Sequence, residues 1–73
     1  MDSEVAYRVD ELASAAGVTV DTVRFYQARG LLPRPQRRGR VAVYDDRHAG
    51  ALRTIREYQG QGFPLALIGR LLE

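Results

Sequence analysis

The stretch Thr19–Leu32, TVDTVRFYQARGLL, constrains the fold of this 73-residue chain more than any other. Thr19 has a side chain suited to a helix N-cap, and Val18 and Val23 stand where a hydrophobic staple would enclose it. Gly30 stands where a left-handed C-terminal cap is needed. The stretch therefore predicts one short, capped helix. Because so short a helix is marginal alone, one of its faces must pack on the rest of the chain.

The two faces of this helix differ in chemistry. At about 100° per residue, Val23, Tyr26 and Gly30 share the apolar face. The opposite face carries Val20, Asp21, Arg24, Gln27 and Ala28. Arg and Gln side chains can meet base edges in a DNA groove, and an Asp can accept a hydrogen bond from cytosine. The polar face is therefore a candidate DNA-reading surface, with a surface ion pair between Arg24 and Asp21 as the alternative.

The composition argues against several kinds of site. The chain has no cysteine and a single histidine, so we expect no disulfide and no metal site. It also lacks a nucleophile–base set and a phosphate-binding loop, so neither an enzyme nor a cofactor is expected. No apolar run approaches the length of a membrane span, and the N-terminus has no signal-peptide pattern. We expect a cytoplasmic, nucleoid-associated protein without a membrane partner.

The basic residues are unevenly placed. All 11 are arginine, and the formal net charge is only +2. Four of them crowd one loop, namely Arg34, Arg37, Arg38 and Arg40. Genomic base composition would explain the missing lysine but not the clustering. Because Arg grips a phosphate with two parallel N–H bonds, the loop is a candidate nucleic-acid contact, with a merely solvated loop as the alternative.

A second helix is expected before the first. Asp10 is a suitable N-cap, and Gly17 would end the helix. Apolar residues at i, i+3, i+4 and i+7 form its buried stripe, namely Val9, Leu12, Ala13 and Ala16. Only a tight turn fits between Gly17 and Thr19. Two helices joined in this way form the helix-turn-helix pattern.

The segment Leu32–Tyr44 predicts a β-hairpin. Its prolines and Gly39 preclude a helix, and a β-prone run follows that glycine. We expect the tip near Arg37–Gly39 and Val41, Val43 or Tyr44 packed inward. Because a two-stranded hairpin is not stable alone, it must lie against the helices as a wing.

Two further helices complete the expected fold. Asp45 or Asp46 would cap the third helix, with His48 on its surface. Its buried stripe would comprise Ala49, Leu52, Ile55 and either Tyr58 or Gln59. Pro64 suits the first turn of a fourth helix. The apolar face of that helix would comprise Leu65, Ile68, Leu71 and Leu72.

The expected fold class is mainly α. It is a winged helix-turn-helix with four helices and a two-stranded β wing between helices two and three. Residues 1–73 would form a single domain. The apolar stripe of the fourth helix is still running at Glu73, so we expect a fragment cut from something longer or a fraying last helix.

Two motifs, VRFYQARGLLP (residues 23–33) and QGFPLALI (residues 61–68), together resemble the N-terminal domain of MerR-type transcriptional regulators. The resemblance covers about Tyr7 to Leu72. It implies sequence-specific binding of double-stranded promoter DNA, a second wing around the third and fourth helices, and distortion of the promoter so that RNA polymerase can engage it. It also implies a homodimer made by a coiled coil, with an effector domain beyond, and neither is expected within these 73 residues.

The resemblance also carries site residues onto this chain. The recognition helix would span about Thr19–Arg29 and enter the major groove, with the Arg-rich wing on the phosphate backbone. The expected DNA-contacting residues are Thr19, Val20, Asp21, Arg24, Tyr26, Gln27, Arg37, Arg38 and Arg40. Tyr26 lies on the inward face, so a core position is the alternative to a phosphate contact through its hydroxyl. Asp21 departs from the family, which often has a basic residue there, and it could accept from cytosine or repel phosphate.

The wing departs most from the family pattern Gly-Tyr-Arg-x-Tyr. Here residues 39–44 read GRVAVY. Counting back from the final tyrosine, Val41 and Ala42 stand where the Tyr-Arg pair would be. Either Arg38 and Arg40 take over phosphate contact from a shifted hairpin, or this wing grips less. Two other functions stay open, an excisionase-like DNA-bending accessory protein and a protein-interaction domain.

Overall fold

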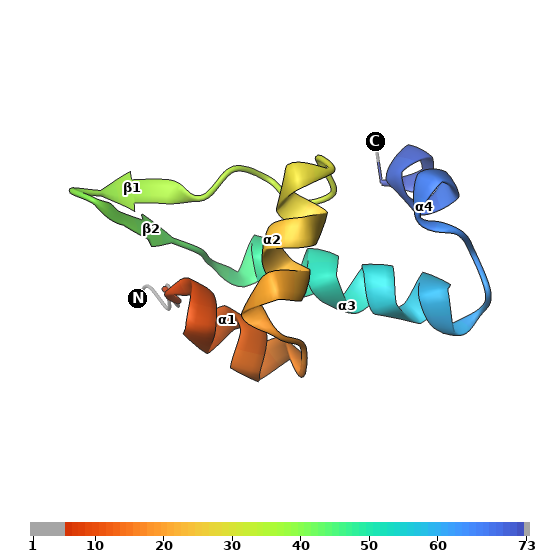
Figure 1. Ribbon diagram of the computed structural model, residues 1–73, viewed down its shortest axis with the longest axis horizontal. Helices are drawn as coiled ribbons and strands as arrows, with labels where there is room; N and C mark the ends of the chain where they lie inside the picture. The colour runs from red at the N-terminus through yellow and green to blue at the C-terminus, as the bar shows by residue number, and fades with distance from the viewer. Residues whose placement is uncertain (1–5, 73) are drawn as a thin grey trace.

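The computed structural model describes residues 6–72, which form four helices and a two-stranded antiparallel sheet. In chain order the elements are α1 (Val9–Ala16), α2 (Val20–Ala28), β1 (Gln36–Arg38), β2 (Val41–Val43), α3 (Asp46–Gly60) and α4 (Leu65–Leu71). The hairpin projects from one side of the helices, and α4 lies at the opposite end (Figure 1). The predicted winged helix-turn-helix is confirmed.

Helix α1 begins at Val9, before the residue Asp10 that was predicted as its N-cap. Its N-cap is Arg8, whose backbone N–H donates to Glu11 Oε1 at 2.8 Å. The Asp10 prediction is wrong, because the Glu11 carboxylate reaches back to the start of the helix while Asp10 lies within the first turn. Gly17 ends α1 with φ 73°, as expected.

Both predicted caps of α2 are present. The Thr19 hydroxyl accepts the backbone N–H of Thr22 at 3.1 Å. Gly30 has φ 76°, and the next N–H, from Leu31, donates to the carbonyl of Tyr26 at 3.0 Å. This left-handed closure turns the chain away from α2 and toward the hairpin.

The hairpin closes through a two-residue turn at Gly39 and Arg40, so its tip lies slightly later than predicted. Gly39 has φ 64°, which suits the first central position of such a turn. The cross-strand pairs are Gln36 with Val43, Arg37 with Ala42 and Arg38 with Val41. At the base of the hairpin, the backbones of Tyr44 and Tyr7 exchange hydrogen bonds of 2.7 and 2.8 Å.

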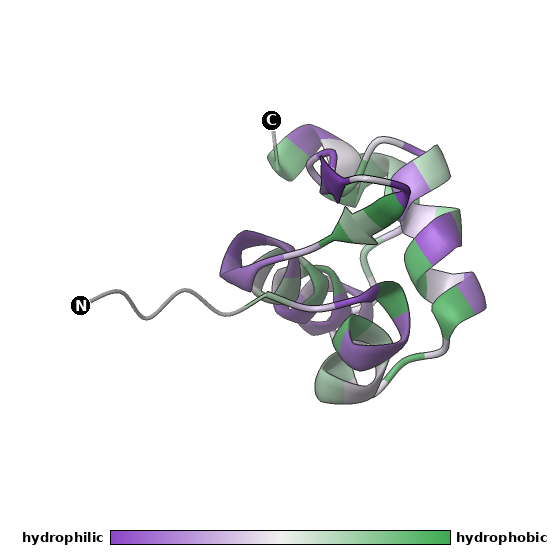
Figure 2. Cartoon of the chain, turned by 90° about the vertical axis from the view of Figure 1, so that its left-hand side faces the viewer, coloured by the Kyte–Doolittle hydropathy of each residue, from purple (hydrophilic) through white to green (hydrophobic). Residues whose placement is uncertain are grey.

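The core lies between the helices and the base of the hairpin. Its fully buried apolar side chains are Leu12, Val23, Leu52, Ile55 and Ile68. The helices in Figure 2 carry both green and purple segments, as expected of amphipathic helices around one core. Of the residues expected to pack inward, Tyr44 is buried, whereas Val41 and Leu71 are exposed. Pro64 is the N-cap of α4 rather than part of its first turn.

His48 is buried rather than on the surface, so that prediction is wrong. It is 1% exposed, and its ring packs edge-on against Tyr44 at 5.0 Å. Nε2 lies 3.0 Å from the carbonyl oxygen of Pro33, and Nδ1 accepts the backbone N–H of Asp45 at 3.0 Å. His48 thereby fastens the loop after α2 to the start of α3.

Asp45 is the N-cap of α3 and should make stability depend on pH. The side-chain hydrogen bond from Arg47 holds the pKa of Asp45 below its ordinary 3.8. The folded carboxyl therefore binds a proton less readily than the unfolded one, and its stabilisation is present above about pH 3.8 and lost as pH falls through the lower folded pKa. We expect Asp45→Asn to lower the free energy of unfolding at neutral pH. In urea titrations at decreasing pH, the gap to the wild type should narrow once the pH falls below about 3.8. A gap of constant size would contradict this assignment.

Candidate nucleic-acid interface

The candidate interface starts with the outer ridge of α2. Asp21, Arg24 and Ala28 are exposed, whereas Val20 and Gln27 are half-buried. This ridge is opposite the buried Val23, as the helical period requires. In the described part of the chain, an ion pair joins Arg47 to Asp45 at 3.2 Å, and none joins Arg24 to Asp21. The Arg24 guanidinium is therefore not held by the neighbouring carboxylate.

Two polar side chains of α2 already have partners within the fold. Tyr26 is 5% exposed, and its hydroxyl donates to Gln59 Oε1 at 2.9 Å. Gln27 Oε1 accepts the hydroxyl of Tyr44 at 2.9 Å. The Gln27 amide N–H groups remain for other partners, whereas Tyr26 joins α2 to α3. The Thr19 hydroxyl is likewise engaged as the cap of α2.

A groove of about 760 Å³ separates α2 from the hairpin. Three arginines reach it from three segments: Arg24 from α2, Arg34 from the connecting loop and Arg37 from β1. Its other lining residues are Gln27, Ala28, Pro35, Ala42 and Tyr44. Because no carboxylate lines this groove, its potential is positive, which suits the phosphate backbone of a nucleic acid.

The alternation of β1 separates two arginines that are adjacent in sequence. Successive side chains of a strand point to opposite faces. Arg37 shares a face with its cross-strand partner Ala42, and both line the groove beside α2. Arg38 shares the other face with Val41 and lines a different hollow, beside Arg8. The wing therefore presents one strand arginine, not two, toward α2.

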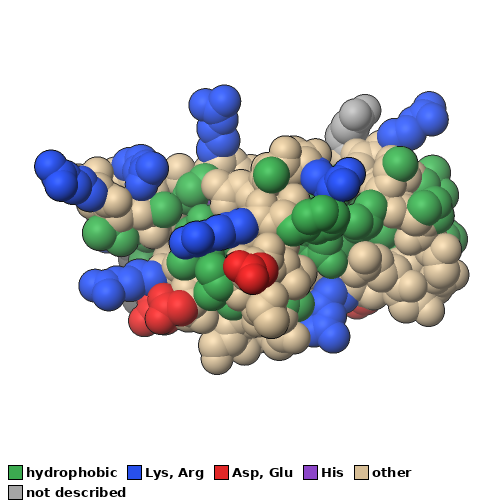
Figure 3. Space-filling model, viewed as in Figure 1, with side chains coloured by type: hydrophobic (Ala, Val, Ile, Leu, Met, Phe, Trp, Pro, Cys, Tyr) green, Lys and Arg blue, Asp and Glu red, His purple; other side chains and the backbone are tan. Residues whose placement is uncertain are grey.

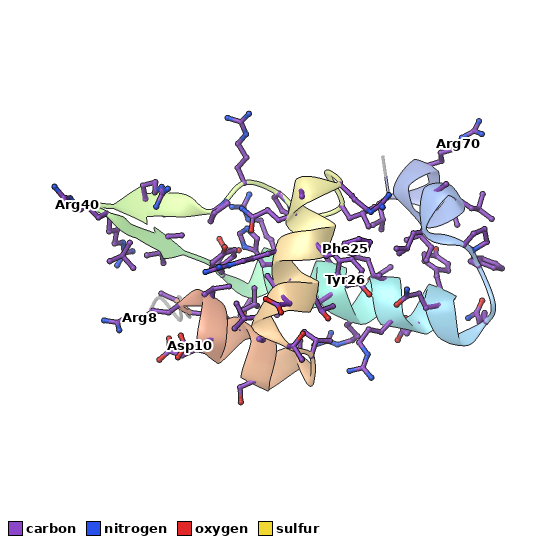
Figure 4. All side chains as sticks on the ribbon, viewed as in Figure 1. Arg8, Asp10, Phe25, Tyr26, Arg40 and Arg70 are labelled. Carbon is purple, nitrogen blue, oxygen red and sulfur yellow. The ribbon has the colours of Figure 1, made fainter. Side chains whose placement is uncertain are left out.

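The remaining arginine of the hairpin lies at its tip. Figure 4 shows Arg40 at the outer end of the hairpin, away from the helices. Its backbone carbonyl accepts a hydrogen bond from Arg37 Nη1 at 3.2 Å, which holds the Arg37 side chain along the hairpin. In Figure 3, blue Arg side chains lie around the hairpin end and across the middle of this face.

Phe25 is an exposed residue of α2 outside the predicted set of DNA-contacting residues. It is 45% exposed, and the Arg29 guanidinium lies 4.5 Å from its ring centre. Figure 4 shows it on the side of α2 that faces away from the hairpin. This position could have been predicted from helical spacing, since Phe25 follows Asp21 by four residues and so lies on the same ridge.

Comparison with known proteins decides the family. The protein-family model described as MerR HTH family regulatory protein matches residues 7–73 of this chain. This chain belongs to the MerR family.

Among described residues, no group of three potential ligands is placed to hold a metal ion, and no helix has the length and apolar character to span a membrane.

Curated relatives include mercuric resistance operon regulatory proteins of Serratia marcescens and Bacillus cereus. The first is 43% identical over 61 residues, covering 82% of this chain and 42% of the relative. The second is 36% identical over 67 residues, covering 90% of this chain and 51% of the relative. The chain thus spans about half the length, or less, of these MerR-family proteins.

Solved structures share the fold. The lead(II) complex of the transcription regulator PbrR691 from Ralstonia metallidurans CH34 superposes with a TM-score of 0.86 at 40% identity, covering 90% of this chain and 52% of that one. HiNmlR, a MerR family regulator lacking the sensor domain and bound to promoter DNA, superposes with a TM-score of 0.84 at 26% identity. This superposition covers 93% of this chain and 52% of HiNmlR.

Proposed function

We propose that this chain is the DNA-binding domain of a MerR-type transcriptional regulator and binds a specific double-stranded promoter sequence. The observation that carries the proposal is the arginine-lined groove between α2 and the hairpin, with the ridge of α2 exposed beside it. A MerR-family regulator with the same fold is bound to promoter DNA. Helix α2 would enter the major groove, and the hairpin would follow the adjacent backbone.

The residues divide into two roles. Arg24 and Asp21, on the exposed ridge, would meet base edges and supply sequence preference. Arg34 and Arg37 of the groove, with Arg40 at the tip, would contact phosphates and supply affinity and register. Tyr26 is left out of both sets because its ring is buried and its hydroxyl is engaged.

Selection of bound duplexes from a random pool tests the function. We expect one enriched sequence, here called the selected duplex, which the chain binds more tightly than a scrambled duplex. Affinity for both should fall as salt rises, since phosphate contacts release counterions. Absence of salt-dependent binding to any duplex would instead favour a protein-interaction domain.

The partners of the whole regulator are part of the same proposal. We propose a homodimer that places two copies of α2 on two half-sites, and RNA polymerase as the partner at the promoter. Residues 1–73 would supply the DNA-binding domain of each subunit. The isolated chain should then bind a half-site weakly as a monomer, because half-site pairing requires the dimer. Sedimentation of the chain as a tight dimer would contradict that expectation.

Arg37 and Arg38 provide a matched pair for the wing. Arg37→Ala should weaken binding to selected and scrambled duplexes alike and reduce the slope of log affinity against log salt by about 1. Arg38→Ala removes the same charge from the opposite face of the hairpin and should change that slope much less. Fluorescence anisotropy at several salt concentrations measures both variants. Equal effects would show that net charge, rather than the groove, governs binding.

A further inference from the structure

Phe25 leaves a large apolar surface unused by the fold. Phe25 is 45% exposed although it lies in the middle of α2. Beside it is a hollow of about 430 Å³ between α2 and the start of α4, whose lining includes Asp21, Thr22 and Leu65. The ring therefore has open space next to it on the same ridge that carries Asp21.

Arg29 packs against one face of the Phe25 ring. Its guanidinium lies 4.5 Å from the ring centre, one helical turn after Phe25. One face of the ring is thereby covered by a cation, and the neighbouring ring of Tyr26 packs at 5.9 Å in a tilted arrangement. These contacts favour one orientation of Phe25, in which the uncovered face of the ring is presented to an outside group.

The ridge has different chemistry on its two sides. Arg24 lies on the side that lines the hairpin groove, and Phe25 lies on the side toward α4. In the major groove the apolar group presented by bases is the C5 methyl of thymine, and Phe is among the side chains that contact it. A phenyl ring has no hydrogen-bonding group with which to read any other base edge.

We infer that Phe25 is a specificity residue that contacts a thymine methyl group in the major groove, with Arg29 holding the ring in place. This inference rests on the proposed function, because it requires α2 to lie in that groove. It adds a base preference that the polar residues of the ridge cannot supply. A second copy of the chain, or another segment of the regulator, is the competing occupant of the exposed ring.

Replacement of thymine by deoxyuridine tests the inference directly. Each thymine of the selected duplex is replaced in turn, which removes one methyl group and leaves the base-pair hydrogen bonds unchanged. The wild-type chain should lose about fourfold in affinity at one position per half-site, which is the expected effect of one buried methyl group. Phe25→Ala should bind the unmodified duplex more weakly and lose nothing further at that position. Phe25→Leu should retain part of the discrimination.

A matched control removes another exposed hydrophobic residue. Leu67 lies on α4 and is exposed to a similar degree, so Leu67→Ala should keep the wild-type response to deoxyuridine. Thermal unfolding of both alanine variants checks that they fold. The inference is overturned if Phe25→Ala responds to deoxyuridine as the wild type does, or if no thymine matters to the wild type. Failure of the wild type to bind any duplex would instead overturn the proposed function itself.

Sedimentation separates the competing occupants. A Phe25→Ala variant that changes the association state of the chain while keeping the deoxyuridine response would assign the ring to protein contact and contradict the inference. An unchanged association state together with a lost methyl response supports DNA reading.

Discussion

Replacement of Arg24 by alanine should weaken binding to the selected duplex by about 1–3 kcal/mol and leave binding to a scrambled duplex nearly unchanged. The physical reason is the position of the guanidinium. It is exposed on the ridge of α2, lines the positive groove, and is not paired with Asp21. It is therefore available for a bidentate contact with a guanine edge, which discriminates against other bases. Titrations of both duplexes at one salt concentration measure the difference.

Two further variants separate base reading from charge. Arg24→Lys keeps the charge but loses the planar fork of donors, so it should bind the scrambled duplex as the wild type does and should not restore the sequence preference that Arg24→Ala loses. Arg53→Ala removes an exposed arginine of α3 and should leave the preference intact. An equal loss on both duplexes for Arg24→Ala would assign that residue to phosphate contact.

Replacement of His48 by alanine should lower the free energy of unfolding by about 2–4 kcal/mol. The substitution leaves the Pro33 carbonyl and the Asp45 N–H without their partner and opens a void beside Tyr44. For a domain of this size, each kcal/mol lowers the Tm by about 4–8 °C. Thermal denaturation followed by circular dichroism should therefore show a fall of roughly 10 °C or more.

Asparagine at the same position refines this expectation. Its side-chain oxygen can still accept the N–H of Asp45, but it is too short to reach Pro33, so His48→Asn should be less damaging than alanine. A loss below about 1 kcal/mol for His48→Ala would show that the two hydrogen bonds contribute little. Pro33 belongs to the loop between α2 and the hairpin. Both variants should therefore also make the position of the hairpin relative to α2 less well defined.

The local features of the fold were predictable from the sequence. The two caps of α2 involve partners close in the chain. The Thr19 hydroxyl accepts the backbone N–H of Thr22, and the turn at Gly30 brings the N–H of Leu31 to the carbonyl of Tyr26. The buried stripes of α1 and α3 follow from helical periodicity in the same way. Even here a competing carboxylate misled the prediction, because Glu11 satisfies the N-terminus of α1 in place of Asp10.

The proposed DNA-reading residues were predictable in part. Arg24 follows from the polar face of one helix, and the arginine cluster of the wing follows from composition. Which of those arginines faces α2 depends on the strand register, and a shift of one residue would exchange Arg37 with Arg38. That register follows from the turn at Gly39, which the sequence placed only approximately.

The sequence by itself determined that this chain has a capped helix with a polar ridge, preceded by a helix and followed by an arginine-rich hairpin, because those features depend on groups a few residues apart. Only the tertiary structure decided that His48 is buried, that Tyr26 is bonded to Gln59, and that Phe25 is left exposed. Each of these depends on segments that are distant in sequence and are brought together, or kept apart, by packing.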